Sequence, residues 1–146
     1  MGILATALTN LAAVPVTGVT SFPPDETPDA LTGAQLPALL ILPELGGTWP
    51  GLEPSRFSAA DGTLTVRVAH MLLLAPVTGG TGLGSALPVL ADAIDTYAAA
   101  LAGEPTLDGA LAVALRCTVQ AGVVRYAGID YHGATFFHDW QLAISP

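Results

Sequence analysis

Between residues 63 and 103 the hydrophobic positions change from a period of two to a period of three or four. The first set, on one face of an alternating pattern that His70 interrupts, is Leu64, Val66, Val68, Leu72 and Leu74. Alternation of this kind predicts a β-strand. The second set, a stripe that leaves Asp92, Asp95 and Ala99 on the opposite side, is Leu87, Leu90, Ile94, Ala98 and Leu101. This spacing predicts an amphipathic helix that can lie on the sheet.

Residues suited to helix ends flank this stripe. Ser85 is a suitable N-cap, and Pro88 is tolerated in a first turn because its missing N–H would have no helical partner. Gly103 suits the left-handed position after a helix, and Pro105 prevents the helix from continuing. The pattern therefore predicts a helix that begins after Ser85 and stops at Gly103.

Four more elements are expected around this unit. Residues 2–14 have helical spacing in a short segment that Pro15 ends, and residues 36–42 form a near-continuous apolar run typical of a strand. Residues 111–126 and 129–144 predict two further strands. In the last of them one face carries His132, Phe136, His138, Trp140, Leu142 and Ile144.

Two long stretches have no usable period. They cover about residues 15–35, with a proline-rich centre at 23–28, and residues 44–61. Both are expected to be extended loops, and the first is expected to be an arm that contacts a neighbouring molecule. The whole chain, residues 1–146, then reads as a single α+β domain. Its sheet is expected to be mostly antiparallel with about four strands, with one long helix and a short N-terminal helix packed on it.

The composition adds an expectation about assembly. Only 11% of the residues are charged, against roughly 25% in an ordinary soluble domain, and 51% are hydrophobic. The mean hydropathy of +0.58 raises the question of a membrane span. Every apolar run is nevertheless interrupted well short of the ~20 residues that a bilayer requires, so no transmembrane helix is expected. The scarcity of charge predicts instead that copies or partners cover part of the surface.

The charges that are present are mostly negative. The four basic residues are all arginine, at 56, 67, 116 and 125, and twelve acidic residues bring the net charge to −8. Binding to the outside of nucleic acid is disfavoured because neutralising phosphates requires a basic patch. The single cysteine, Cys117, excludes an intramolecular disulfide and is expected to be a small buried hydrophobe.

The glycine-rich segment Gly79–Gly84 is the most prominent candidate for a cofactor site. A glycine-rich turn between a strand and a helix is where a dinucleotide pyrophosphate binds, and this one is similar to the turn of extended short-chain dehydrogenases. The spacing departs from the dinucleotide fingerprint, and the chain lacks the successive parallel units of a Rossmann sheet. The absence of lysine excludes a Walker-type phosphate loop. We therefore expect a linker and no cofactor.

Several other polar residues are of the types found in catalytic and metal-binding sites. His132 and His138 with Asp139 are ligand types, but six residues of strand separate the two histidines by roughly 20 Å, too far for one metal. A triad of His70 and Asp61 with Ser58 or Ser85 lacks a nucleophile elbow. Asp92 and Asp95 are expected on a solvated helix face. No catalytic, cofactor-binding or metal-binding residue, and no enzymatic activity, is therefore predicted.

The order of the predicted elements and the kinds of residue in them are similar to those of a known protein family. The segments concerned are residues 36–42, the strand 64–74, the helix 87–101 with Gly103–Gly109 after it, and the closing pair around 124–128 and 131–137. Together they resemble the tail terminator and tail-completion proteins of long-tailed bacteriophages. The loop at 44–61 has no counterpart in this comparison.

The resemblance implies a structural protein of the virion, located in the phage tail or neck and assembled in the host cytoplasm. Such a protein forms a ring, commonly of six copies, that caps the tail tube and joins it to the head-tail connector. DNA would pass through the lumen without specific binding, and acidic residues such as Asp25, Glu26, Asp29, Asp92 and Asp95 are expected to include some that face it. Two alternatives stay open: another ring component, such as a head-tail adaptor or tube protein, and a small nucleotide-binding enzyme that uses Gly79–Gly84.

Overall fold

The computed structural model of the chain describes residues 2–41, 56–77 and 83–145, with the side chains of Leu83 and Ser85 left aside. The helices are α1 (Ile3–Ala13), the 3-10 helix η1 (Gly33–Gln35) and α2 (Leu83–Ala102). The strands are β1 (Thr20–Ser21), β2 (Ala38–Ile41), β3 (Arg56–Ser58), β4 (Thr63–Pro76), β5 (Arg116–Tyr126) and β6 (Ile129–Ala143). None of the described helices combines the length and the apolar character needed to cross a membrane.

The sheet has six strands, so the expectation of about four was wrong. The order is β1-β2-β4-β6-β5, and β3 pairs with β4 beside β2. Strands β1 and β2 are parallel, and the other pairs are antiparallel. The two unexpected strands, β1 and β3, lie in the stretches predicted as loops. They have only two and three residues, too few for a hydrophobic period to be visible.

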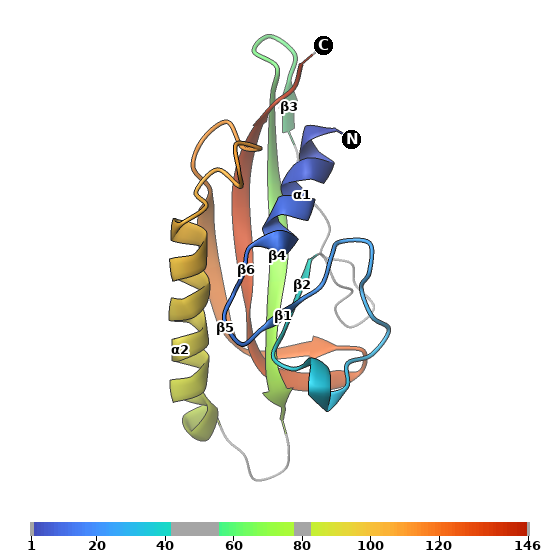
Figure 1. The fold of residues 1–146 in the computed structure, drawn as a ribbon, viewed down its shortest axis with the longest axis vertical. Helices are drawn as coiled ribbons and strands as arrows, with labels where there is room; N and C mark the ends of the chain where they lie inside the picture. The colour runs from blue at the N-terminus through green and yellow to red at the C-terminus, as the bar shows by residue number, and fades with distance from the viewer. Residues whose placement is uncertain (1, 42–55, 78–82, 146) are drawn as a thin grey trace.

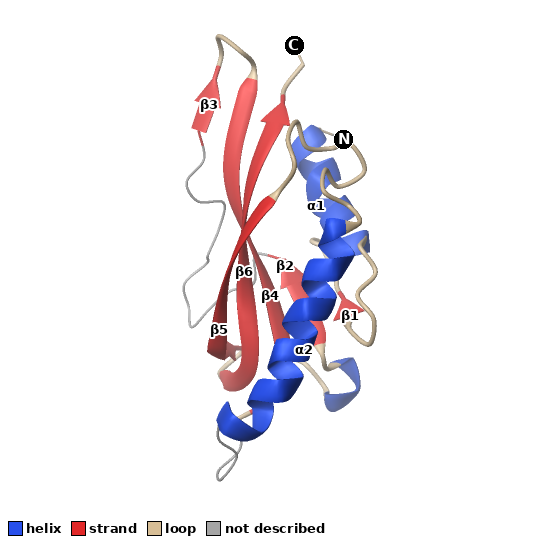
Figure 2. Ribbon diagram, turned by 90° about the vertical axis from the view of Figure 1, so that its left-hand side faces the viewer, coloured by secondary structure: helices blue, strands red, loops and turns tan. Residues whose placement is uncertain are grey.

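Both α-helices, α1 and α2, lie on one side of this sheet (Figures 1 and 2). Because side chains alternate along a strand, the even-numbered residues of β4 and β6 face the helices. The main hydrophobic core forms there, and its largest fully buried side chains include Trp140, Tyr97 and Phe136. Strands β4 and β6 therefore form the centre of the molecule.

The buried stripe of α2 is rotated from the predicted one. Leu90, Tyr97 and Leu101 are buried, whereas Leu87 is 52% exposed and Ala98 is also exposed. Spacings of seven and four connect the three buried residues, so Tyr97 takes the central place that the prediction gave to Ile94. The helix also begins before the predicted N-cap, Ser85, which lies inside it.

The predicted arm at 15–35 packs on its own sheet. Its residues Phe22 and Leu31, followed by Leu36, contact a second cluster on the sheet face away from the helices, formed by Leu40, Met71, Leu73, Val124, Tyr126 and Tyr131. The hydroxyl of Tyr126 donates a hydrogen bond to the carbonyl of Pro28. The arm thus supplies a small core of its own within the domain. Most of the second predicted loop, 44–55, lies outside the described residues.

A pair of glycines accompanies an irregularity in the sheet near the β5–β6 hairpin. Gly122 (φ +143°) lies opposite Gly133, and β4 shifts register between Leu73 and Ala75. A Cβ atom on Gly133 would lie 2.0 Å from the carbonyl oxygen of Leu72. Only glycine permits this close approach of β6 to β4. Glycine pairs and bulges of this kind bend a sheet, and the hairpin turns across one end of the molecule (Figure 1).

Candidate interaction surface

Strand β5 is the outer strand of the sheet on the side opposite β1. Among the described residues no strand pairs with its outer edge. All residues from Arg116 to Ala121 are exposed, and the segment 117–124 contains neither a charged residue nor a proline. Monomeric proteins usually protect such an edge with charge, proline or a covering segment, because its backbone groups can pair with another chain. Along residues 117–124 this edge is therefore protected neither by charge nor by proline.

An apolar groove lies between β5 and α2, which packs mainly on β6. We call it the α2–β5 groove. It has a volume of about 300 Å³ and is lined by Ile94, Tyr97, Ala98, Leu101, Ala102, Pro105, Leu115, Cys117, Val119 and Phe136. No residue of this set carries a formal charge at neutral pH, and Val119 is 42% exposed at the strand edge. The groove and the edge therefore form one continuous uncharged surface.

Cys117 lies where the edge and the groove meet. The residue is exposed, which corrects the expectation of a buried hydrophobe, but its thiol helps to line the groove. Burial of the thiol, with a smaller contribution from the Asp139 carboxylate, raises the pKa of Cys117 to about 12. The thiol is therefore protonated at neutral pH and is a poor nucleophile.

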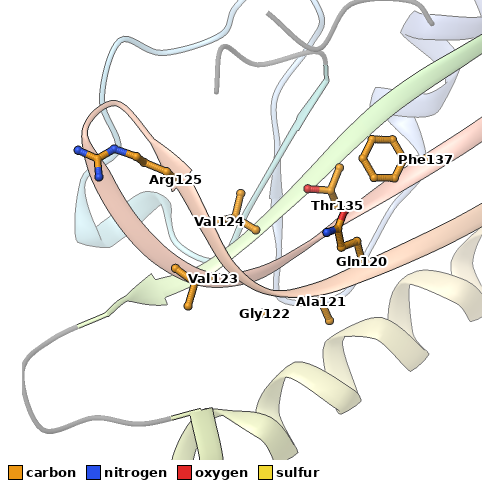
Figure 3. Close-up of a pocket in the computed structure, with 8 residues that line it drawn as sticks. All are labelled: Gln120, Ala121, Gly122, Val123, Val124, Arg125, Thr135 and Phe137. Carbon is orange, nitrogen blue, oxygen red and sulfur yellow. The ribbon is translucent and has the colours of Figure 1, made fainter. Parts of the chain in front are cut away.

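A second hollow lies on the other face of β5 (Figure 3). Its volume is about 340 Å³, and its lining consists of Gln120, Ala121, Gly122, Val123, Val124, Arg125, Thr135 and Phe137. The Arg67 guanidinium lies over the Phe137 ring at 4.9 Å from its centroid and pairs with Asp139 at 3.8 Å. Arg125 points outward at the hairpin end and pairs with Asp130 at 3.6 Å. Arg125 is the only ionisable side chain of this lining, so the hollow does not gather the groups that catalysis needs.

The most unusual polar feature is buried beneath α2. The Tyr97 hydroxyl lies 2.8 Å from Nδ1 of His70 and 2.6 Å from Nε2 of His138. The Tyr97 ring also stacks on Phe136 with centroids 3.7 Å apart. A hydroxyl has one hydrogen to donate, so one imidazole accepts from Tyr97 while the other donates to it. Both hydrogen bonds can therefore form with the two histidines neutral.

Burial keeps the three members of this network uncharged. It lowers the pKa of His70 well below 6.5, with His138 adding to the effect, and lowers the pKa of His138 to about 4. Burial, with a smaller contribution from Cys117, raises the pKa of Tyr97 well above 10. All three side chains are at most 2% exposed, and of the three Tyr97 alone also lines the α2–β5 groove, so the two imidazoles are out of a ligand's reach. The network can stabilise the core, but it is not placed for chemistry on a ligand.

The candidate catalytic triad is not assembled. Ser58 and Asp61 are neighbours at the β3–β4 turn, where hydrogen bonds from Ser58 and from the backbone N–H of Thr63 lower the pKa of Asp61. His70, by contrast, lies in the core with Tyr97 as its partner. The side chain of Ser85 lies outside the described residues.

The metal and cofactor candidates have similar outcomes. Within residues 2–41, 56–77 and 83–145 no three His, Cys, Asp or Glu side chains gather as a metal site. His132 and His138 are both buried on the helix-facing side of β6, whereas Asp139 lies on the opposite face with Arg67. In the Gly79–Gly84 segment, residues 79–82 are outside the described part of the chain, and Gly84 is already helical.

The sequence contained a signal for the position of Tyr97 in the core and none for the α2–β5 groove. Tyr97 is seven residues after Leu90 and four before Leu101, so helical spacing places it on the same stripe as these two leucines. The predicted stripe passed through Ala98 instead and therefore did not include Tyr97. The α2–β5 groove depends on where the helix lies across the sheet, which no local pattern encodes.

Comparison with known proteins adds no family to this description. No protein-family model matches the chain, and no curated protein matches it.

Proposed function

We propose that the protein is a structural subunit of a bacteriophage virion that assembles into a ring, caps the tail tube and joins it to the head-tail connector. The observation that carries the proposal is the open edge of β5 beside the α2–β5 groove. An uncharged strand edge next to an apolar groove is suited to burial against another protein. The resemblance in element order supplies the tail-terminator role.

The two edges of the sheet differ, which allows a head-to-tail contact that can close into a ring. The outer strand on one side is β5, and β1 and β3 occupy the other side. If the β5 side of one copy contacts the opposite side of the next, the contact is heterologous and can repeat around a closed ring. A ring of this kind has two different ends, as a protein between a tail tube and a connector requires.

The charge distribution is compatible with a lumen through which DNA passes. The only charged residues of α2 are Asp92 and Asp95, both exposed on its outer side. Arg67 belongs to the opposite face of the sheet, where it pairs with Asp139. If α2 faces the lumen, DNA meets these two carboxylates, and the face that carries Arg67 is turned away from it.

The buried polar network also fits a structural role better than an enzymatic one. The Tyr97 hydroxyl pairs with one nitrogen of each histidine, and all three side chains are shielded from solvent, although Nε2 of His70 and Nδ1 of His138 have no partner among the described residues. In an enzyme of this size a perturbed pKa would be expected at a residue that lines an accessible pocket. Tyr97 and Cys117 line the groove, but the pKa of each is raised, which holds both protonated at neutral pH.

Mass measurement and imaging test the proposal directly. The purified protein should have the mass of a closed oligomer, for which six copies is the expected number, and should appear as rings by electron microscopy. Particles of the phage should carry it between tail tube and connector. A protein that stays monomeric at high concentration and is absent from virions would overturn the proposal. Its position in an assembled particle separates a terminator from a head-tail adaptor or a tube protein.

A ligand screen tests the remaining alternative, a nucleotide-binding enzyme. NAD, NADP and ATP are added separately while the thermal unfolding temperature is recorded. A ligand that binds only the native state must raise this temperature. We expect no shift, and a rise of several degrees at sub-millimolar ligand would contradict the structural proposal.

A further inference from the structure

We infer that Phe57 of one copy inserts into the α2–β5 groove of the next copy, with β3 of the first copy pairing alongside β5 of the second. This inference rests on the proposed ring and names the surfaces that form its repeating contact. Phe57 is 55% exposed, although large aromatic side chains are normally kept from water. It lies on β3, across the sheet from β5.

The side chain of Phe57 points to the face of the sheet on which the α2–β5 groove opens. Phe57 pairs with Leu64 of β4, which packs on the main core beneath the helices. Paired residues on neighbouring strands point to the same face, so Phe57 points to the helix-covered side. The α2–β5 groove opens on that same side, since Ile94 and Leu101 of α2 line it. Two copies placed edge to edge in one orientation therefore bring the aromatic ring to the groove.

The directions of the strands also agree. Strand β3 is antiparallel to β4, β4 to β6, and β6 to β5. Continuing the sheet from β5 into β3 of an equally oriented copy therefore gives an antiparallel pair. Antiparallel pairing satisfies backbone N–H and C=O groups along the open edge of β5.

No charged residue lies directly opposite Arg56 in this pairing. If Phe57 lies opposite Cys117, then Arg56 lies opposite Thr118; if Phe57 lies opposite Val119, Arg56 lies opposite Gln120. Both registers place the arginine against a neutral polar residue and the phenyl ring against a residue that lines the groove. The groove, at about 300 Å³ and without a charged lining residue, has the size and chemistry for one aromatic side chain.

The single cysteine of the chain makes the contact directly testable. Phe57→Cys also removes the aromatic ring and should weaken assembly, but copies still meet through the same surfaces at high protein concentration. The new thiol would then enter the groove of the neighbour beside its Cys117, and oxidation with diamide should trap the contact by joining the two. Within one copy, β4 and β6 separate these positions by three strand spacings, roughly 14 Å, which exceeds the reach of a disulfide of about 7 Å between Cα atoms. Denaturing gels without reductant should therefore show a ladder of multimers.

Two control variants make the result specific. Phe57→Cys combined with Cys117→Ser should give no ladder, and Ile129→Cys, a comparably exposed apolar position at the other end of the sheet, should also give none. Mass spectrometry of the digested ladder should identify the 57–117 peptide pair. A ladder built instead from 57–57 and 117–117 pairs would overturn the inference, because it would show symmetric contacts.

Phe57→Ala provides a test without oxidation. The variant should keep its thermal unfolding transition as a monomer but lose ring mass, whereas Ile129→Ala should retain it. Rings that persist in Phe57→Ala, together with the absence of a 57–117 link in Phe57→Cys, would overturn this contact while leaving the proposed function intact. A wild-type protein that never assembles would overturn the proposed function itself.

Discussion

At the scale of single residues, the core is organised by a polar group. Tyr97 connects His70 and His138 across sequence separations of 27 and 41 residues, and its ring stacks on Phe136. A buried hydrogen-bond chain is favourable only while every link is made, because an unpaired polar group in the core costs more than the bond contributes. The three residues therefore behave as a unit.

Replacing Tyr97 with phenylalanine tests this unit. The change removes the hydroxyl and leaves a buried nitrogen of each histidine without its partner. We expect the free energy of unfolding to fall by about 1–3 kcal/mol, measured by urea denaturation. Tyr126→Phe loses one hydrogen bond at a partly buried site and should cost less. Equal losses in the two variants would show that the network has no special weight.

The same network predicts a dependence on pH. The histidines are neutral in the folded state, with the pKa of His138 near 4 and that of His70 well below 6.5, whereas in the unfolded chain both titrate near 6.5. Between about pH 6.5 and 4 the unfolded state binds more protons, so stability should fall as the pH is lowered through this window. Urea denaturation at several pH values measures the slope. His138→Phe should flatten it, and an unchanged slope would contradict this assignment.

At the scale of elements, α2 and the bend near Gly122 and Gly133 decide the shape of the domain. The helix packs one stripe on β6, and its outer side carries the exposed carboxylates of Asp92 and Asp95. The glycine pair permits a close approach between β6 and β4 that a side chain would prevent. Both features can be tested by single substitutions with matched controls.

Leu90 and Leu87 provide the matched pair for the helix. Leu90 is buried, and Leu90→Ala should lower the free energy of unfolding by roughly 2–5 kcal/mol, as other changes that leave a cavity in a core do. Leu87 is half exposed, so Leu87→Ala should change stability little. Both values come from urea denaturation of the same background. A larger loss for Leu87→Ala than for Leu90→Ala would show that Leu87 belongs to the core, as the sequence pattern predicted.

Gly133→Ala tests the bend. The added Cβ would lie 2.0 Å from the carbonyl oxygen of Leu72, so the backbone must shift. We expect a loss of about 1–3 kcal/mol or more in the free energy of unfolding, as overpacking produces. Gly33→Ala, where a Cβ meets nothing within 4 Å, is the control and should be nearly neutral. Indistinguishable unfolding curves for the two variants would disprove the close approach.

At the scale of the whole molecule, the low charge and the open edge of β5 both concern assembly. The charged fraction of 11% leaves much of the surface apolar, and the α2–β5 groove concentrates part of it beside an unpaired strand. Phe57 supplies an exposed aromatic group at the opposite edge of the sheet. A ring would bury the edge of β5, the α2–β5 groove and Phe57 together.

The acidic side of α2 gives a prediction for the assembled particle. Asp92→Asn with Asp95→Asn should leave ring formation unchanged but slow DNA passage, because two carboxylates that repel phosphate are removed. The difference from wild type should shrink at 1 M salt, where the Debye length is about 3 Å. DNA ejection rates from particles measure both effects. Asp108→Asn, outside α2, serves as the control, and equal slowing by it would argue against a lumen lined by α2.

The sequence by itself determined the α+β class, the long strand β4, the helix α2 with its end at Gly103, and the last two strands. Each of these is encoded by a local period that continues over ten or more residues. Only the tertiary structure decided the strands β1 and β3, the partners of Tyr97 and the α2–β5 groove. Strands of two or three residues have no period of their own and exist because a neighbouring strand pairs with them. The network and the groove depend in the same way on segments that are distant in the chain, and their contacts form only when α2 lies on β6.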